Sequence, residues 1–256
     1  MFRRSLAGLL ASVVAVAVSL SVSPSPAHAA TTVYYAGGRQ TVSASVLFAN
    51  FGVGKPVVAE GETHSAAMMV ARDPSSNGVG IGWMVDRARH GDDDPHLVVA
   101  WWKDGAGQCY NTECPGFTPW AGATIALGQK FTPGTPQRFG IQRSGDGWWL
   151  WAGTTDNVGS YIGYFSDSNW TAPWPLFSGV QLYGQVIAPT NVAPVSEMGN
   201  GLCSSDVNAL TISSVSYSTT ADKAVNLSAF ATYPRVYSSE RLTARTIRYG
   251  GSGICD

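Results

Sequence analysis

Acid–base chemistry in this chain has to come from few carboxylates and imidazoles. Glutamate occurs only at positions 60, 62, 113, 197 and 240, and beyond residue 29 the histidines are His64, His90 and His96. None of these histidines has the H-E-x-x-H spacing of a zinc metalloprotease. No serine stands in the G-x-S-x-G pattern of a nucleophile elbow. The sequence therefore supports neither of those hydrolase classes.

The densest polar cluster is the run Asp92–Asp94, with His90 and His96 beside it. Such a cluster is typical either of a metal-binding loop or of a solvated turn whose aspartates cap backbone amides. Calcium takes about six to eight oxygen ligands, and the spacing of an EF-hand loop is missing here. We therefore predict a turn, with no metal site and no cofactor.

Four cysteines, Cys109, Cys114, Cys203 and Cys255, allow three disulfide pairings. Cys109 and Cys114 enclose only Tyr-Asn-Thr-Glu, so a hairpin-like loop is expected to close between them. This leaves Cys203 with Cys255, a bond that would fasten the C-terminus to the domain. A zinc site is the alternative, but no histidine lies close to either pair in the sequence.

Tryptophans are neighbours at Trp101-Trp102 and at Trp148-Trp149. Adjacent residues of a strand point to opposite faces, so one tryptophan of each pair is expected in the core. Trp149 is predicted to point away from the face that Trp148 and Leu150 share. It then either packs under a covering segment or stacks on a sugar or proline ring.

Short strand patterns separated by turn residues dominate the chain, which predicts an all-β antiparallel sandwich or barrel. The expected strands are 32–35, 64–72, 78–86, 97–103, 137–143, 148–152, 179–188 and 209–217. Residues 144–147 are predicted to form a hairpin turn. Residues 30–58 are expected to supply edge strands and an entry loop, and residues 221–231 are the one candidate for a short helix.

The first 29 residues have the parts of a secretory signal peptide: Arg3 and Arg4, an apolar stretch from Leu6 to Val22, and the cleavage pattern Ala27-His28-Ala29. The alternative is a membrane anchor, but the apolar stretch is short for a span. We predict one secreted domain, residues 30–256, that does not contact the membrane after cleavage. That part carries 14 basic and 17 acidic residues, a balance that gives no reason to expect a nucleic-acid partner.

Several short motifs occur in a fixed order: Gly82-Trp83-x-Val85, Asp92-Asp93-Asp94-Pro95-His96-Leu97, Cys109-Tyr110-Asn111 through Cys114, Gly116-Phe117, Trp148-Trp149, Gly163-Tyr164-Phe165, Gly184-x-Val186 and Met198-Gly199-x-Gly201. Together they resemble the neprosin family in its bacterial form. The resemblance implies secretion and an antiparallel β-sandwich of the glutamic-peptidase or concanavalin-like type. In active members it implies an endopeptidase that cleaves after proline in acid, using a pair of glutamates.

The chain departs from the family at both glutamate positions. Gly80 stands at the first, two residues before the Gly-Trp pair, and Gln185 stands at the second. Gly80 has no group to accept a proton, whereas the Gln185 amide is able to polarise a carbonyl. Gln181, Tyr183 and Gln185 share a strand face, so they are expected to line a neutral, polar groove.

Three hypotheses follow for the function. The first is a pseudoenzyme that binds an extracellular peptide or polysaccharide through Gln181, Tyr183, Gln185 and a facing tryptophan, Trp149. The second is a working endopeptidase with displaced carboxylates, Glu60 or Glu62, because Asp86 lies too far along its strand from Gly80. The third is a lectin-like module that binds carbohydrate.

Overall fold

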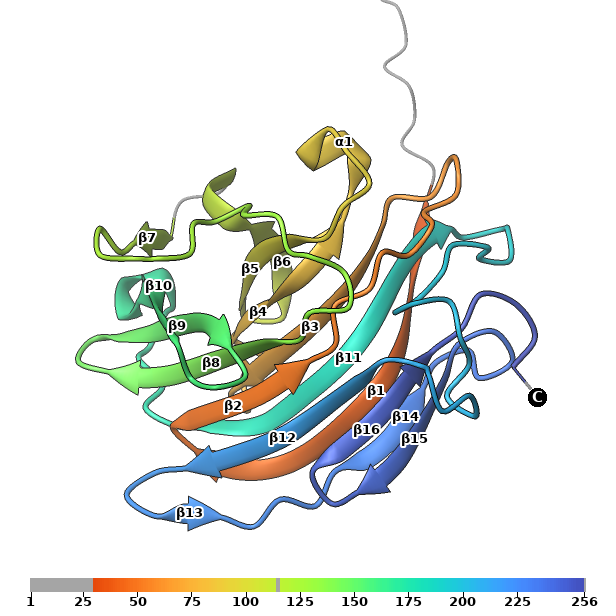
Figure 1. The fold of residues 1–256 in the computed structure, drawn as a ribbon. Coiled ribbons are helices and arrows are strands. Elements are labelled where there is room, and N and C mark those ends of the chain that lie inside the picture. The colour runs from red at the N-terminus through yellow and green to blue at the C-terminus, as the bar shows by residue number, and fades with distance from the viewer. Residues whose placement is uncertain (1–29, 114–115, 256) are drawn as a thin grey trace, which may run out of the picture.

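The chain folds into two packed antiparallel sheets, which confirms the predicted all-β sandwich (Figure 1). The computed structural model describes residues 30–113 and 116–255. Over these residues sheet A has seven strands, in the order β14-β1-β11-β3-β4-β5-β6. Sheet B has nine, in the order β15-β16-β12-β2-β8-β9-β10-β7, with β13 beside β12.

The strands of sheet A are β1 (Thr31–Ala44), β3 (His64–Arg72), β4 (Gly78–Val85), β5 (His96–Lys103), β6 (Ala106–Tyr110), β11 (Phe177–Pro189) and β14 (Ser228–Ala231). Those of sheet B are β2 (Val46–Phe51), β7 (Phe117–Pro119), β8 (Gln137–Ser144), β9 (Gly147–Thr154), β10 (Gly159–Ser166), β12 (Thr211–Ser218), β13 (Asp222–Lys223), β15 (Ser238–Thr243) and β16 (Thr246–Gly250). The helical turns are α1 (Arg87–His90), η1 (Asn111–Glu113) and η2 (Asp167–Asn169).

The main hydrophobic core lies between the sheets and is built from alternate residues of the strands. Trp83 from sheet A and Trp148 from sheet B are both fully buried in it. Trp83 also donates its indole N–H to the carbonyl oxygen of Gly52, 3.0 Å away, so its one polar atom is satisfied. Removing an aromatic side chain of this size from water contributes about 2–3 kcal/mol to folding.

The predicted hairpin at residues 144–147 is confirmed. Ser144 at the end of β8 pairs with Gly147 at the start of β9, which leaves a two-residue turn. Gly145 in that turn has a φ of 58°, a conformation that costs glycine little because it has no Cβ.

Two expectations about secondary structure are wrong. Residues 221–231 form β13 and β14 instead of a helix, because tertiary pairing with β12 and β1 outweighs the weak local preference for helix. Residues 30–58 do not supply edge strands, because β1 lies between β11 and β14 and β2 lies between β12 and β8. Segments late in the sequence return to pair beside both strands.

The predicted signal peptide, residues 1–29, lies outside the described residues. Within the described part of the chain, no helix is long and apolar enough to span a bilayer.

Candidate functional site

The outer face of sheet A, which is turned away from sheet B, carries the residues that the sequence associates with a site. Gln181, Tyr183 and Gln185 lie on this face of β11, because the residues that alternate with them enter the core. Gly80 lies on the same face of β4, where an added Cβ would meet the side chains of Val70 and Trp102.

Much of this face is closed by a second hydrophobic cluster. The cluster contains Ala66, Met68, Val70, Met84, Val98, Ala100, Trp102 and Tyr183, with Tyr35, Tyr110 and Phe230 packed against it. The rings of Tyr35 and Tyr183 meet edge to face at 4.9 Å. Tyr183 is only 3% exposed and Gln185 only 2%. The expected polar groove is therefore not open at these two residues, because aromatic side chains from neighbouring strands cover them.

Gln185 is engaged by His64, the first residue of the neighbouring strand β3. The Nε2 atoms of the two side chains are 2.8 Å apart, and His64 is 3% exposed. An amide nitrogen donates, so the His64 Nε2 accepts and its ring proton resides on Nδ1. Burial lowers the pKa of His64 to about 4, against a smaller upward effect of the Asp86 charge. The imidazole is therefore neutral above that pH, as an acceptor of this hydrogen bond must be.

Tyr110, Arg89 and Asp86 interact with this pair. Burial raises the pKa of the Tyr110 phenol, while a hydrogen bond with Gln185 acts in the opposite direction. The Arg89 guanidinium lies 5.0 Å from the centroid of the Tyr110 ring. Arg89 pairs with Asp86, at 3.5 Å, and with Glu113. One arginine thus neutralises both carboxylates, of which Asp86 is the one whose charge acts on His64.

Position 80 does not face position 185. Gly80 lies opposite Val70 on β3, whereas Gln185 lies opposite Ala66 on the same strand. Four residues along β3 separate the two positions, or about 13 Å. A Cβ at Gly80 would sit 3.1 Å from Val70 Cγ2 and 3.3 Å from Trp102 Cζ3, so the neighbours leave little room for a side chain.

Glu60 and Glu62, the proposed displaced carboxylates, precede β3 in a turn. The carboxylate of Glu62 accepts the backbone N–H groups of Val195 at 2.8 Å and Ser196 at 3.1 Å. These bonds hold a loop in place and engage both oxygens of the carboxylate. Glu60 makes no hydrogen bond or ion pair among the described residues.

The run Asp92–Asp94 lies in a bend between α1 and β5, where Asp92 caps the N–H of Asp94 as expected and all three carboxylates also pair with cationic side chains. Lys130 reaches Asp92 at 2.8 Å and Asp94 at 2.7 Å. Hydrogen bonds from Lys130 and His96 hold the pKa of Asp92 well below its ordinary value. Over residues 30–113 and 116–255, no group of histidine, cysteine and carboxylate side chains has an arrangement able to hold a metal ion.

Trp149 lies on β9, on the outer face of sheet B, so the structure does not bring it together with Gln181, Tyr183 and Gln185. Its ring stacks on Tyr164 at 4.6 Å and meets the edge of Trp120 at 5.5 Å. Trp148 enters the core, so the predicted opposition of the two tryptophans is confirmed.

Cys203 and Cys255 are disulfide-bonded and close a separation of 52 residues, as predicted. Cys109 is also disulfide-bonded. Its predicted partner, Cys114, lies outside the described residues. The Cys203–Cys255 bond fastens the segment after β16 to the loop before β12, which confirms the expected attachment of the C-terminus.

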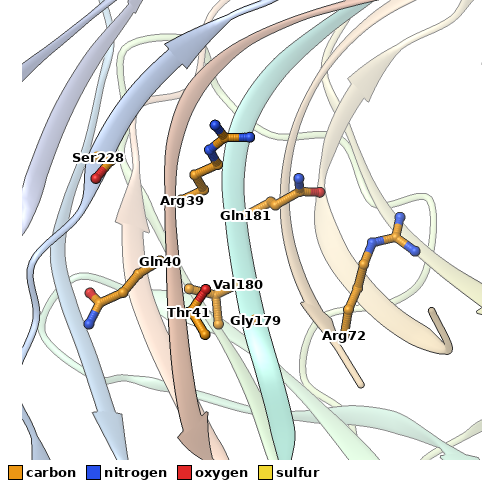
Figure 2. Close-up of a pocket in the computed structure, with 8 residues that line it drawn as sticks. All are labelled: Arg39, Gln40, Thr41, Arg72, Gly179, Val180, Gln181 and Ser228. Carbon is orange, nitrogen blue, oxygen red and sulfur yellow. The ribbon is translucent and has the colours of Figure 1, made fainter. Parts of the chain in front are cut away.

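A pocket opens on the outer face of sheet A at the opposite end of β11 from Gln185. Its volume is about 370 Å³. The lining residues, drawn in Figure 2, are Arg39, Gln40, Thr41, Arg72, Gly179, Val180, Gln181 and Ser228. Gln181 is the one residue of the predicted groove that lines it. We refer to it below as the Arg39–Arg72 pocket.

This sandwich has the architecture of the glutamic peptidases. It superposes on a scytalido-glutamic peptidase with a peptide-based transition-state analogue at a TM-score of 0.53 and 8% identity, covering 87% of this chain and 100% of that one. A second structure of scytalido-glutamic peptidase, with a transition-state analogue inhibitor, gives a TM-score of 0.51 and 10% identity over the same shares of both chains.

Comparison of the sequence with protein-family models identifies the family within this fold class. The model of the family described as Neprosin matches residues 61–252. The chain therefore belongs to the neprosin family, as its motifs predicted. No curated protein matches the chain in sequence at a significant level.

Sequence reasoning missed the partners of Gln185. The sequence predicts a strand that begins at His64 but no role for this residue, and Tyr110 stands out only as part of a motif. The period of two offers a partial signal, because His64 shares a strand face with Ala66, which lies opposite Gln185. Pairing between strands that are far apart in the sequence was needed to identify the contact.

Proposed function

We propose that this protein is a secreted member of the neprosin family that binds peptides and has lost efficient hydrolysis. One observation carries the proposal: Gln185, which stands at a family glutamate position, is 2% exposed and hydrogen-bonded to a neutral His64. A buried, engaged amide is not available to a scissile carbonyl. Among residues 30–113 and 116–255, the groups that contact Gln185 leave it no free carboxylate to take a proton from water.

Hydrolysis of a peptide bond needs a group that accepts a proton as water attacks. The lone pair of His64 Nε2 is already used by the Gln185 amide. Asp86 and Glu113 pair with Arg89 instead of facing a substrate. Loss of a positioned general base typically lowers the rate by about 10²–10⁴-fold.

Secretion is part of the proposal and rests on two features. Residues 1–29 have the three-part composition of a signal peptide. The Cys203–Cys255 disulfide is of the kind that persists in oxidising compartments outside the cytosol. An extracellular peptide is therefore the ligand class that we propose, and its accessible entry is the Arg39–Arg72 pocket.

The test uses purified protein spanning residues 30–256 and a set of proline-containing peptides. Cleavage is followed by mass spectrometry from acid to neutral pH, and binding is followed by fluorescence anisotropy of the same peptides carrying a dye. We expect saturable binding and no cleavage above a protein-free blank. Cleavage beside proline in acid that disappears in Gln185→Ala, but persists in the control Gln142→Ala on sheet B, would overturn the proposal.

A second candidate function, carbohydrate binding, has its own observation. Trp120, Trp149 and Tyr161 gather on the outer face of sheet B, where with Ser144 they line a hollow of about 250 Å³. Trp120 is 50% exposed, and exposed aromatic faces stack well on apolar ring faces. A glycan array tests this candidate, since binding that is lost in Trp120→Ala would favour it over peptide binding.

A further inference from the structure

The Arg39–Arg72 pocket is formed by four adjacent strands of sheet A, β14, β1, β11 and β3. Arg39 on β1 lies opposite Gln181 on β11, and Arg72 on β3 lies opposite Gly179 of the same strand. Because β11 runs between β1 and β3, the two arginines flank it, with the Gln181 amide between them in Figure 2. A Cβ added at Gly179 would meet nothing within 4 Å, so the space above this part of β11 is open.

Each guanidinium is held by an aromatic ring. The Cζ atom of Arg72 is 4.3 Å from the ring centroid of Trp102, and the Cζ atom of Arg39 is 5.4 Å from that of Phe230. Stacking occupies the flat face of a guanidinium and leaves its edge N–H groups able to donate. The rings therefore restrict the two cations while their donors stay available for a ligand.

Neither cation has a carboxylate partner among the residues that the structure describes. Arg72 makes one long contact, 3.5 Å, to the carbonyl oxygen of Ser76. In contrast, four other arginines among the described residues form ion pairs with carboxylates: Arg87, Arg89, Arg143 and Arg248. Two charges of the same sign lining one pocket without a counter-charge repel each other, and an anion between them would relieve that repulsion.

The remaining lining groups complete a set of donors. Gln181 supplies an amide, and Thr41 and Ser228 supply hydroxyls. The two planar guanidinium groups and these neutral donors match the two oxygens of a carboxylate and their four lone-pair positions.

We propose that the Arg39–Arg72 pocket binds a carboxylate of an acidic peptide. This inference deepens the proposed function and rests on it, because it names the class of peptide that the outer face of sheet A selects. The carboxylate belongs either to an Asp or Glu side chain or to the C-terminus of the peptide. Binding leaves all covalent bonds of the peptide intact.

The experiment measures anisotropy with four labelled peptides that share one proline-containing sequence. Two carry a single Glu and two carry Gln at that position, and each version is made with a free and with an amidated C-terminus. The variants are Arg39→Gln, Arg72→Gln and the double variant, with Arg72→Lys retaining charge without the planar fork. Arg241→Gln, at an exposed position of β15 in sheet B, is the matched control.

We expect the carboxylate-bearing peptides to bind more tightly than the neutral one. Each Arg→Gln change is expected to weaken that binding about three- to tenfold, and the double variant more than tenfold. Arg72→Lys is expected to recover part of the loss, and Arg241→Gln to have no effect. Whichever carboxylate is required, side-chain or C-terminal, identifies the source of the anion. Thermal unfolding of each variant shows that the fold is retained.

Three outcomes would overturn the inference. Equal binding of the charged and neutral peptides, unchanged in the double variant, would remove the acidic specificity while leaving peptide binding intact. Competition by inorganic phosphate with no discrimination among the peptides would assign the pocket to a free anion. If none of the four peptides binds, the proposed function fails and the pocket assignment fails with it.

Discussion

Gln185 and His64 lie on neighbouring strands of sheet A with their Nε2 atoms 2.8 Å apart. The contact is diagonal, because Gln185 lies directly opposite Ala66 and His64 directly opposite Ile187. Two residues that are 121 positions apart in sequence therefore form one buried polar pair. A buried amide forms a hydrogen bond with an imidazole without carrying a charge. An ionised glutamate at the same position would bring a negative charge into this buried place.

The low pKa of His64 predicts a loss of stability in mild acid. The pKa of the imidazole is about 4 in the folded protein and 6.5 in an unfolded chain. As pH falls from 6.5 towards 4, the unfolded state takes up a proton that the folded state does not, so the free energy of unfolding decreases. The shift corresponds to about 3 kcal/mol, and the decline from this group ends below the folded pKa.

Urea unfolding at neutral pH and at a pH just above 4 measures this decline. His64→Gln retains an amide that is able to pair with Gln185 and removes the titrating group. The variant should lose less stability than the wild type between the two pH values. An equal loss in both proteins would show that His64 does not titrate in this way.

A carboxylate in place of Gln185 should raise the pKa of His64. In Gln185→Glu the negative charge lies within hydrogen-bond distance of the imidazole and favours its protonated form, opposing the effect of burial. Titration of the His64 ring signals by NMR is expected to move upward by at least one pH unit. Gln142→Glu, on the outer face of sheet B, is the control and should leave the titration unchanged.

Removing the charge of Glu62 should affect stability and not peptide binding. Glu62→Gln keeps one acceptor oxygen and loses the charge-assisted bonds to the N–H groups of Val195 and Ser196. We expect a decrease of about 1 kcal/mol in the free energy of unfolding. Glu60→Gln is the matched control, and a variant at either position with altered peptide binding would contradict the assignment of these residues.

Substituting Trp149 should leave peptide binding unchanged. Trp149 packs on Tyr164 and Trp120 at the outer face of sheet B, whereas the Arg39–Arg72 pocket opens on the outer face of sheet A. Trp149→Ala is expected to lower stability through the lost ring contacts, by about 1–3 kcal/mol, and to leave the anisotropy titrations as they are in wild type. Weaker peptide binding in this variant, with the fold intact, would indicate that the peptide binds on sheet B and would contradict binding in the Arg39–Arg72 pocket.

The face of the strand on which each side chain lies was largely predictable, because the alternation of side chains along a strand is a local property. The opposition of Trp148 and Trp149 follows from the period of two, as does the shared face of Gln181, Tyr183 and Gln185. The errors arose where distant segments pair. The stretch 221–231 has no strong local pattern, and only its pairing with β1 and β12 makes it strand.

The sequence by itself predicted the fold class, the family and the Cys203–Cys255 bond, and it predicts the replacement of both family glutamates, because motifs, periodicity and cysteine spacing are properties of the chain. Only the tertiary structure decided that Gln185 is closed against His64 and that Arg39 and Arg72 line one pocket. The physical reason is strand order: β11 pairs with β1 on one side and β3 on the other. The residues that pair with Gln181 and Gln185 across the neighbouring strands are therefore more than a hundred positions away in the sequence.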